Sequence, residues 1–167
     1  MKNKYLHFML LSNALIVLDQ YTKFLVTTHL PLYYSVRVID NFFSITHIRN
    51  PGVAFGLFAQ HDSEYKALIF IVISTVAILA ILVIFHQTQG DKGMVQTGLI
   101  LIFGGAVGNL IDRIIYKEVI DFLQFYYDQY SFPAFNIADS CITIGVGLMI
   151  LDLFKKQPDK MAGPEIQ

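Results

Sequence analysis

The stretch ALIFIVISTVAILAILVIF, residues 67–85, is interrupted by only two polar side chains, Ser74 and Thr75. A helix that crosses the hydrocarbon core of a bilayer needs about 20 mostly apolar residues, and this run meets that requirement without carrying a charge. Because the stretch offers no group that can act on a substrate, we expect it to serve packing and membrane insertion. It places the chain among membrane proteins.

The composition of the whole chain agrees with that class. Of its 167 residues, 54% are hydrophobic and only 15% are charged, which is well outside the average for soluble proteins. Twelve Lys and Arg residues stand against 13 Asp and Glu residues, so the net charge is −1. This balance lacks the excess of basic residues that binds nucleic acid by counterion release. We therefore expect no nucleic-acid partner.

The cysteine and histidine content argues against metal, redox and Ser/His chemistry. The single cysteine, Cys141, cannot form an internal disulfide, and the five histidines form no HExxH or other paired ligand pattern. Ser140 and Cys141 have no histidine near them in the sequence that could activate a nucleophile. We therefore expect no metal site and no cofactor.

Three further segments have the length and composition of membrane spans, at residues 5–29, 94–115 and 137–154. With the first stretch they predict an all-α, four-transmembrane-helix bundle, a single integral membrane domain over residues 1–167 with both termini on one side. The N-terminus resembles a secretory signal but lacks a small-residue cleavage site, so we interpret it as a retained first helix. Lysines near both termini and Lys92 favour a cytoplasmic location for that side, although basic residues are almost as numerous opposite.

The first outer connection, residues 31–66, contains YYSVRVI and FFSITHI, two β-rich runs joined by a turn. They predict a small extracytoplasmic hairpin on the membrane surface. In the continuation RNPGVAFG, Pro51 and Gly52 follow Asn50, which suggests a tight turn that fixes the direction of the Asn50 amide. A solvated loop is the alternative interpretation.

The second outer connection, residues 116–136, is rich in aromatic side chains, which suit the headgroup level of a membrane. We interpret it as an interfacial aromatic segment. Its rings are Phe122, Phe125, Tyr126, Tyr127, Tyr130, Phe132 and Phe135.

Polar residues gather near the outer ends of the predicted spans. An Asp at the centre of a transmembrane helix costs roughly 2.5 to 3.5 kcal/mol on insertion scales, so each such charge requires a reason. Because the fourth span runs back inward, residues at its start lie at the same level as those near the ends of the first and third spans. The members of this layer are Asp19, Asn50, Asn109, Asp112, Arg113, Asp121, Asn136 and Asp139.

Each member also has a purely structural explanation. Asp19 can pair with Lys23 at i+4 while Lys23 extends outward to water. GGAVG provides a small-residue face for close helix packing. Asn136 can cap the fourth helix with Asp139 at its third position. These explanations treat the residues singly and do not account for their common level.

If Asp121 and Asp139 meet in a partly dry site, the two carboxyl groups share a proton. The ionised partner can then draw a proton from water while the protonated one donates to a carbonyl oxygen, which hydrolyses a peptide bond without a metal. A proton- or ion-coupled transporter is the alternative, because intramembrane Asp, Asn and Arg residues also build proton relays. A transporter more often shows inverted repeats and charges through the full membrane thickness.

Four motifs resemble those of the lipoprotein signal peptidases of bacteria, the signal peptidase II family. LDQYTK resembles the family's D-x-x-T-K, and RNPGVAFG resembles its N-x-G-x-A-F loop. GGAVGNLIDRIIYKEVIDF and FPAFNIADSCITIG resemble its third and fourth motifs. The resemblance extends from Asp19 to Gly145, without a departure at a motif position.

The resemblance implies an aspartic endopeptidase of the bacterial inner membrane, with both termini cytoplasmic and the site near the outer leaflet. Its catalytic pair would be Asp121 and Asp139. Its substrates would be diacylglyceryl-prolipoproteins, cut immediately before the lipidated cysteine, with membrane lipids as the other partners. A self-contained site makes a monomer sufficient. The substrate-binding or supporting residues would be Asp19, Lys23, Asn50, Gly52, Gly105, Asn109, Arg113, Asn136 and Ala138.

Overall fold

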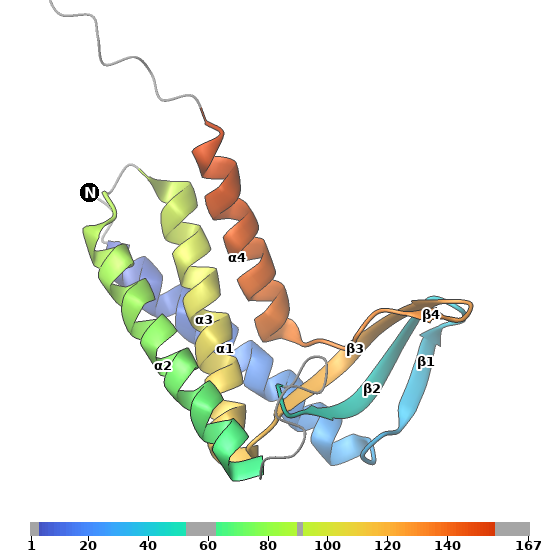
Figure 1. Ribbon diagram of the computed structural model, residues 1–167. Coiled ribbons are helices and arrows are strands. Elements are labelled where there is room, and N and C mark those ends of the chain that lie inside the picture. The colour runs from blue at the N-terminus through green and yellow to red at the C-terminus, as the bar shows by residue number, and fades with distance from the viewer. Residues whose placement is uncertain (1–3, 53–62, 90–91, 156–167) are drawn as a thin grey trace, which may run out of the picture.

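The computed structural model describes residues 4–52, 63–89 and 92–155. Helices occupy the four segments that the sequence predicts as spans, and Figure 1 shows them packed as a bundle. The start of α1, the end of α2, the start of α3 and the end of α4 lie at one end of this bundle (Figure 1). The helices are α1 (Lys4–His29), α2 (Ser63–Gln87), α3 (Gly93–Tyr116) and α4 (Ile137–Leu153).

Two helix segments in the described part of the chain are long and apolar enough to cross a membrane, Tyr65–Gln87 and Gly93–Tyr116. Helix α2 exposes large apolar side chains such as Val72, Val76 and Leu79. A soluble protein rarely exposes a contiguous apolar surface of this kind, whereas lipid covers it at no cost. Helix α4 is shorter, with 17 residues, and α1 carries the charged residues Asp19 and Lys23 in its second half.

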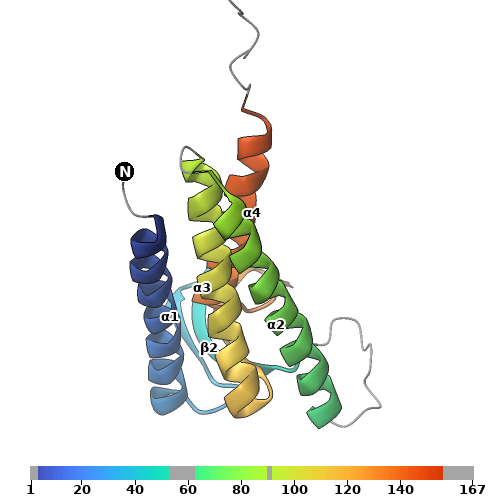
Figure 2. The same cartoon turned by 90° about the vertical axis from the view of Figure 1, so that its left-hand side faces the viewer.

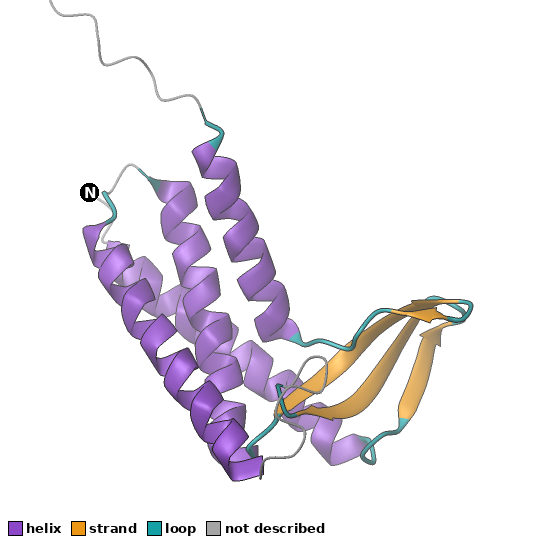
Figure 3. Cartoon of the chain, in the orientation of Figure 1, coloured by secondary structure: helices purple, strands orange, loops and turns teal. Residues whose placement is uncertain are grey.

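The two outer connections form one antiparallel sheet in the order β1-β2-β3-β4. Figure 3 shows this sheet extending away from the bundle, at the end where α1 finishes and α4 begins. The predicted hairpin in the first connection is confirmed, since its two strands pair with each other. The strands are β1 (Ser35–Ile39), β2 (Phe43–Asn50), β3 (Val119–Tyr127) and β4 (Tyr130–Ser131).

The predicted fold class is therefore correct only in part: the helices and a small β-element are present, but the second connection supplies half of a four-stranded sheet, so the chain is not all-α. The interfacial aromatic interpretation fails for part of this segment: Phe122 is buried, and Phe125 packs against Phe43 of β2 with ring centroids 4.9 Å apart. β-Branched and aromatic residues fit a pleated surface, so the same composition that suits a membrane interface also suits a strand. Tyr127 and Phe132, farther along, remain exposed.

Helix α3 lies at the centre of the bundle and contacts the other three helices. Figure 2 shows it between α1 and α2, with α4 behind. A Cβ atom on Gly105 would collide with the Ala138 carbonyl oxygen of α4, so this glycine allows the two backbones to touch. Such close packing, expected from the small-residue motif, brings the first turn of α4 against the outer half of α3.

Candidate active site

Asn136 joins the two aspartates that the sequence singles out. It lies directly before α4, and its side-chain Nδ2 donates to Asp121 Oδ1 of β3 at 2.8 Å. Its backbone N–H donates to Asp139 Oδ2 at 3.2 Å. Two carboxylates from separate parts of the chain thus share one neighbour at the junction of the sheet and the bundle.

The capping explanation of Asn136 and Asp139 is also correct. Asn136 Oδ1 accepts from the Asp139 N–H at 2.9 Å, and the reciprocal bond to Asp139 Oδ2 completes a capping box. A capping box satisfies amides that have no partner within the helix. The same two residues therefore start the helix and build the site, and the cap fixes where the Asp139 carboxylate lies.

Asp121 is held from the other side by Asn50, at the end of β2. Asn50 Nδ2 donates to Asp121 Oδ2 at 2.8 Å, while Asn50 Oδ1 accepts from the Gly52 N–H at 2.8 Å. Gly52 has φ of +78° and leaves no room for a Cβ atom beside the Phe70 ring, so glycine is required there. The predicted tight turn is present and directs the amide nitrogen toward the carboxylate. Residues 53–56 of the same motif lie outside the described residues.

Burial, together with the nearby charge of Asp139, raises the pKa of Asp121 to about 6, although the hydrogen bonds from Asn50 and Asn136 and the charge of Lys23 act to lower it. The Asp121 side chain is only 2% exposed, so its charged form loses most of its hydration. An acid with a pKa near 6 exists in both protonation states close to neutral pH. This property suits a group that gives and takes protons.

Asp139 accepts a further hydrogen bond from Asn109 of α3, whose Nδ2 donates to Asp139 Oδ1 at 2.8 Å. The orientation of that amide is fixed because its oxygen accepts from Lys23 Nζ at 3.0 Å and from Asn136 Nδ2 at 3.2 Å. An amide whose oxygen faces two donors must turn its NH2 group the other way. The direction of the bond to Asp139 is therefore set by its neighbours.

Lys23 does not extend outward to water, and that prediction is wrong. Its side chain is 1% exposed, and Nζ lies 2.7 Å from Asp19 Oδ2 and 2.8 Å from Asp112 Oδ2. Two buried carboxylates hold the ammonium inward, because a buried charge is stabilised by a close partner of opposite sign. Asp19 Oδ1 also accepts from the Ala138 N–H at 2.9 Å, and Asp112 Oδ2 from the Ile120 N–H at 3.1 Å.

This buried cluster ties α1, α3, α4 and β3 together beside the aspartate pair. Two of its members, Asp112 and Gln20, had no role assigned from the sequence. Gln20 Nε2 donates to Asp112 Oδ1 at 2.9 Å and to the Gly108 carbonyl at 3.0 Å. The available signal for Asp112 was its spacing of three residues from Asn109, which places both on one face of α3.

Arg113 lies near the pair but bonds elsewhere. Among the described contacts its Nη1 donates to the Asn109 carbonyl at 3.3 Å, and its guanidinium lies 5.4 Å from the centre of the Phe70 ring. Gly105 and Ala138 contribute backbone packing, as described above. In the described part of the chain no group of three or more His, Cys, Asp or Glu side chains is arranged to hold a metal ion.

Two solved structures, each described as a bacterial membrane enzyme, share this fold. One aligns with a TM-score of 0.81 and 34% identity over 96% of this chain and 94% of its own. The second aligns with a TM-score of 0.79 and 35% identity over 90% of this chain and 94% of its own. The fold therefore places this chain in the class of membrane-embedded bacterial enzymes.

The sequence comparisons identify the family. The model of Peptidase_A8, signal peptidase (SPase) II, matches residues 11–155. A protein of Desulforapulum autotrophicum named lipoprotein signal peptidase is 48% identical over 90% of this chain and 93% of its own length. One of the same name from Syntrophus aciditrophicus is 42% identical over 96% and 99%. The chain belongs to the signal peptidase II family and is a protease, as the four sequence motifs predict.

Proposed function

We propose that the protein is an aspartic endopeptidase that removes the signal peptide from diacylglyceryl-prolipoproteins, immediately before the lipidated cysteine. Its catalytic pair is Asp121 and Asp139. The observation that carries this proposal is the bridge through Asn136, which bonds both carboxylates at once. Membership of the signal peptidase II family and the names of the relatives support the substrate class.

The chemistry follows from a proton shared between two nearby carboxyl groups. One carboxylate takes a proton from the water that attacks the scissile carbonyl carbon, and the other carboxyl group donates a proton to the carbonyl oxygen. The raised pKa of Asp121 suits it to hold the shared proton at rest. Asp139, fixed by Asn109 and the helix cap, is then the group that activates water. Arg113, with no bond to either carboxylate among the described contacts, remains available to the substrate backbone.

The location of the pair suits a lipid-anchored substrate. It lies where the sheet joins the bundle beside the first turn of α4, and Figure 1 shows the sheet projecting sideways from the bundle there. In the proposed topology all four helices cross the inner membrane, both termini are cytoplasmic, and the sheet and its exposed rings Tyr127, Tyr130 and Phe132 lie at the outer surface. All partners of the two carboxylates described above belong to one chain, so a monomer is sufficient.

Cleavage of a purified diacylglyceryl-prolipoprotein tests the proposal. Asp121→Asn should retain the fold and lose turnover by at least about a hundredfold, because the amide can no longer exchange the proton. Asp128→Asn is the matched control, since Asp128 is an exposed carboxylate at the end of the same region of sheet. The precursor without its diacylglyceryl group should be cut poorly. Substantial turnover by Asp121→Asn would remove the aspartate pair from the mechanism.

A further inference from the structure

The pairing of β2 with β3 changes register beside the aspartate pair. Ile45 lies opposite Leu123, and the next recorded pair is Ile48 opposite Asp121. Two residues of β2 therefore lie between these pairs, where β3 has only one. Such an insertion is a β-bulge, a feature that often redirects side chains near active sites.

The residues of the bulge are Thr46 and His47, and both are buried. Their presence decides the face on which Asn50 lies, because side chains alternate along a strand and a one-residue slip reverses every face. With the bulge, Asn50 and Asp121 lie on the same face and bond at 2.8 Å. In an uninterrupted register continued from Ile45, His47 would lie opposite Asp121 and Asn50 would point to the other face.

His47 attaches the bulge to the chain that leaves α1. Its backbone N–H donates to the Tyr34 carbonyl at 3.1 Å, and its carbonyl accepts from the Tyr33 N–H at 2.8 Å. Its ring Nδ1 lies 2.8 Å from the Leu30 carbonyl oxygen. A carbonyl oxygen only accepts, so Nδ1 carries the hydrogen in this bond. The His47 side chain is 5% exposed, and it takes no part in the proposed chemistry.

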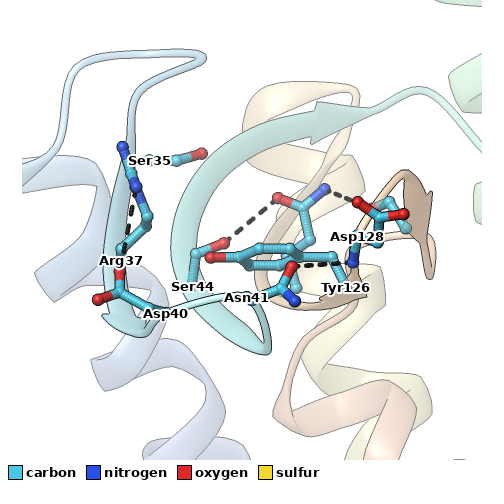
Figure 4. Close-up of a pocket in the computed structure, with 9 residues that line it drawn as sticks. Ser35, Arg37, Asp40, Asn41, Ser44, Tyr126 and Asp128 are labelled. Carbon is cyan, nitrogen blue, oxygen red and sulfur yellow. Dashed lines mark hydrogen bonds and ion pairs between the residues drawn. The ribbon is translucent and has the colours of Figure 1, made fainter.

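The two faces of the sheet have different surroundings, so the register decides which side chains lie beside Asp121 and which line the opposite face. The face opposite Asp121 carries a polar pocket of about 650 Å³, shown in Figure 4, with Ser44 and Tyr126 in its lining. Gln124 bridges this lining, as acceptor from Ser44 Oγ at 3.5 Å and as donor to Ser131 Oγ at 3.0 Å. A slipped register would turn Ile48 toward this polar face.

We propose that His47 is a positioning residue that pins the bulge and thereby keeps Asn50 beside Asp121. The ring contact with the Leu30 carbonyl and the two backbone bonds hold the extra residue out of the ladder. This inference rests on the proposed function, because it acts through the carboxylate that we assign to catalysis. The role of His47 in register is measurable without any catalytic assay.

Disulfide cross-linking reads the register directly, in a Cys141→Ala background. Arg49 lies opposite Ile120 in the observed pairing, whereas Ile48 would lie opposite Ile120 after the slip. Arg49→Cys with Ile120→Cys should therefore cross-link, since directly opposed residues fall within disulfide distance. Adding His47→Leu should reduce this product several-fold, and Ile48→Cys with Ile120→Cys should begin to cross-link.

Variants at the same position separate the hydrogen bond from the bulk of the ring. His47→Gln retains a donor for the Leu30 carbonyl and should preserve the native cross-link. His47→Phe keeps a ring without a donor, and it replaces His47→Leu if that variant does not fold. His29→Leu is the control, because His29 is an exposed histidine in the last turn of α1. An unchanged cross-link in both donor-free variants would overturn the proposal.

A double-mutant cycle connects the register to turnover. His47→Leu should lower kcat about tenfold with little change in KM, because the lost bond from Asn50 reaches a carboxylate and not the substrate. In an Asn50→Ala background the same substitution should cause no further loss. Effects that multiply would contradict action through Asn50. If Asp121→Asn proved active, the proposed function would fail while the cross-linking result would stand.

Discussion

Replacement of Asn50 by Ala should shift the basic limb of the pH–activity profile upward. Asn50 Nδ2 donates to Asp121 Oδ2 at 2.8 Å, and this bond opposes the effect of burial, so that the pKa of Asp121 is raised only to about 6. A hydrogen bond to a charged group contributes about 1.5 to 3 kcal/mol, and 1.36 kcal/mol corresponds to one pKa unit. Loss of the bond should therefore raise the pKa of the carboxyl by about 1 to 2 units.

The sign of the shift follows from the proposed resting state. If Asp121 holds the shared proton, activity falls as pH rises through the pKa at which the pair loses it, so a higher pKa extends activity to higher pH. The assay is kcat/KM for diacylglyceryl-prolipoprotein cleavage between pH 5 and 9. Asn13→Ala is the control, since Asn13 is an exposed amide on α1 that donates to the Met9 carbonyl. A basic limb that stays in place or moves downward would refute the assignment of the proton to Asp121.

Three further predictions concern stability, measured as thermal unfolding in detergent. Lys23→Met should lower the free energy of unfolding by about 3 to 5 kcal/mol, because it leaves two buried carboxylates without their counter-ion. The control Lys155→Met, at an exposed site, should change the free energy of unfolding little. Equal melting temperatures for the two variants would contradict a structural role for the cluster. Gly105→Ala should cost about 1 to 3 kcal/mol by forcing α3 away from the Ala138 carbonyl, and an unaltered melting temperature would argue against that contact. The pKa of Asp121 is raised from 3.8 to about 6 in the folded state, so its contribution to stability is complete below the lower value and is lost as pH rises through the higher one. Asp121→Asn should therefore gain stability relative to wild type by about 2 to 3 kcal/mol between pH 3.5 and pH 7.5. A stability difference that stays constant with pH would be evidence against the raised pKa.

The helices and the hairpin were predictable because their signals are local. A run such as residues 67–85 is stable only as a helix in an apolar environment. The turn in RNPGVAFG orients Asn50 through a hydrogen bond from Gly52, two residues away. The strand β3 was not predictable in the same way. Its partners lie in β2, 69 to 82 residues earlier, and its aromatic side chains suit a membrane interface as well as a sheet.

The direction of the Lys23 side chain was also not predictable from the sequence. A lysine four residues after Asp19 can extend to water or turn inward, and the outcome depends on Asp112, which only the packing of α3 against α1 brings within 2.8 Å. The bulge at His47 did leave a local signal. In FSITHI the alternation of apolar and polar residues slips by one at Thr46 and His47, as expected where a strand carries an extra residue.

The most direct test of the central claim compares two aspartates on the same helix. Asp139 lies in the first turn of α4, beside Asn109 and Asn136, whereas Asp152 lies in the last turn, away from the site. Both should be changed to Asn in otherwise identical protein, and the single-turnover rate of diacylglyceryl-prolipoprotein cleavage should be measured for each. We predict that Asp152→Asn cleaves at the wild-type rate and that Asp139→Asn is slower by at least about a hundredfold. Equal rates in the two variants would contradict catalysis by the aspartate pair.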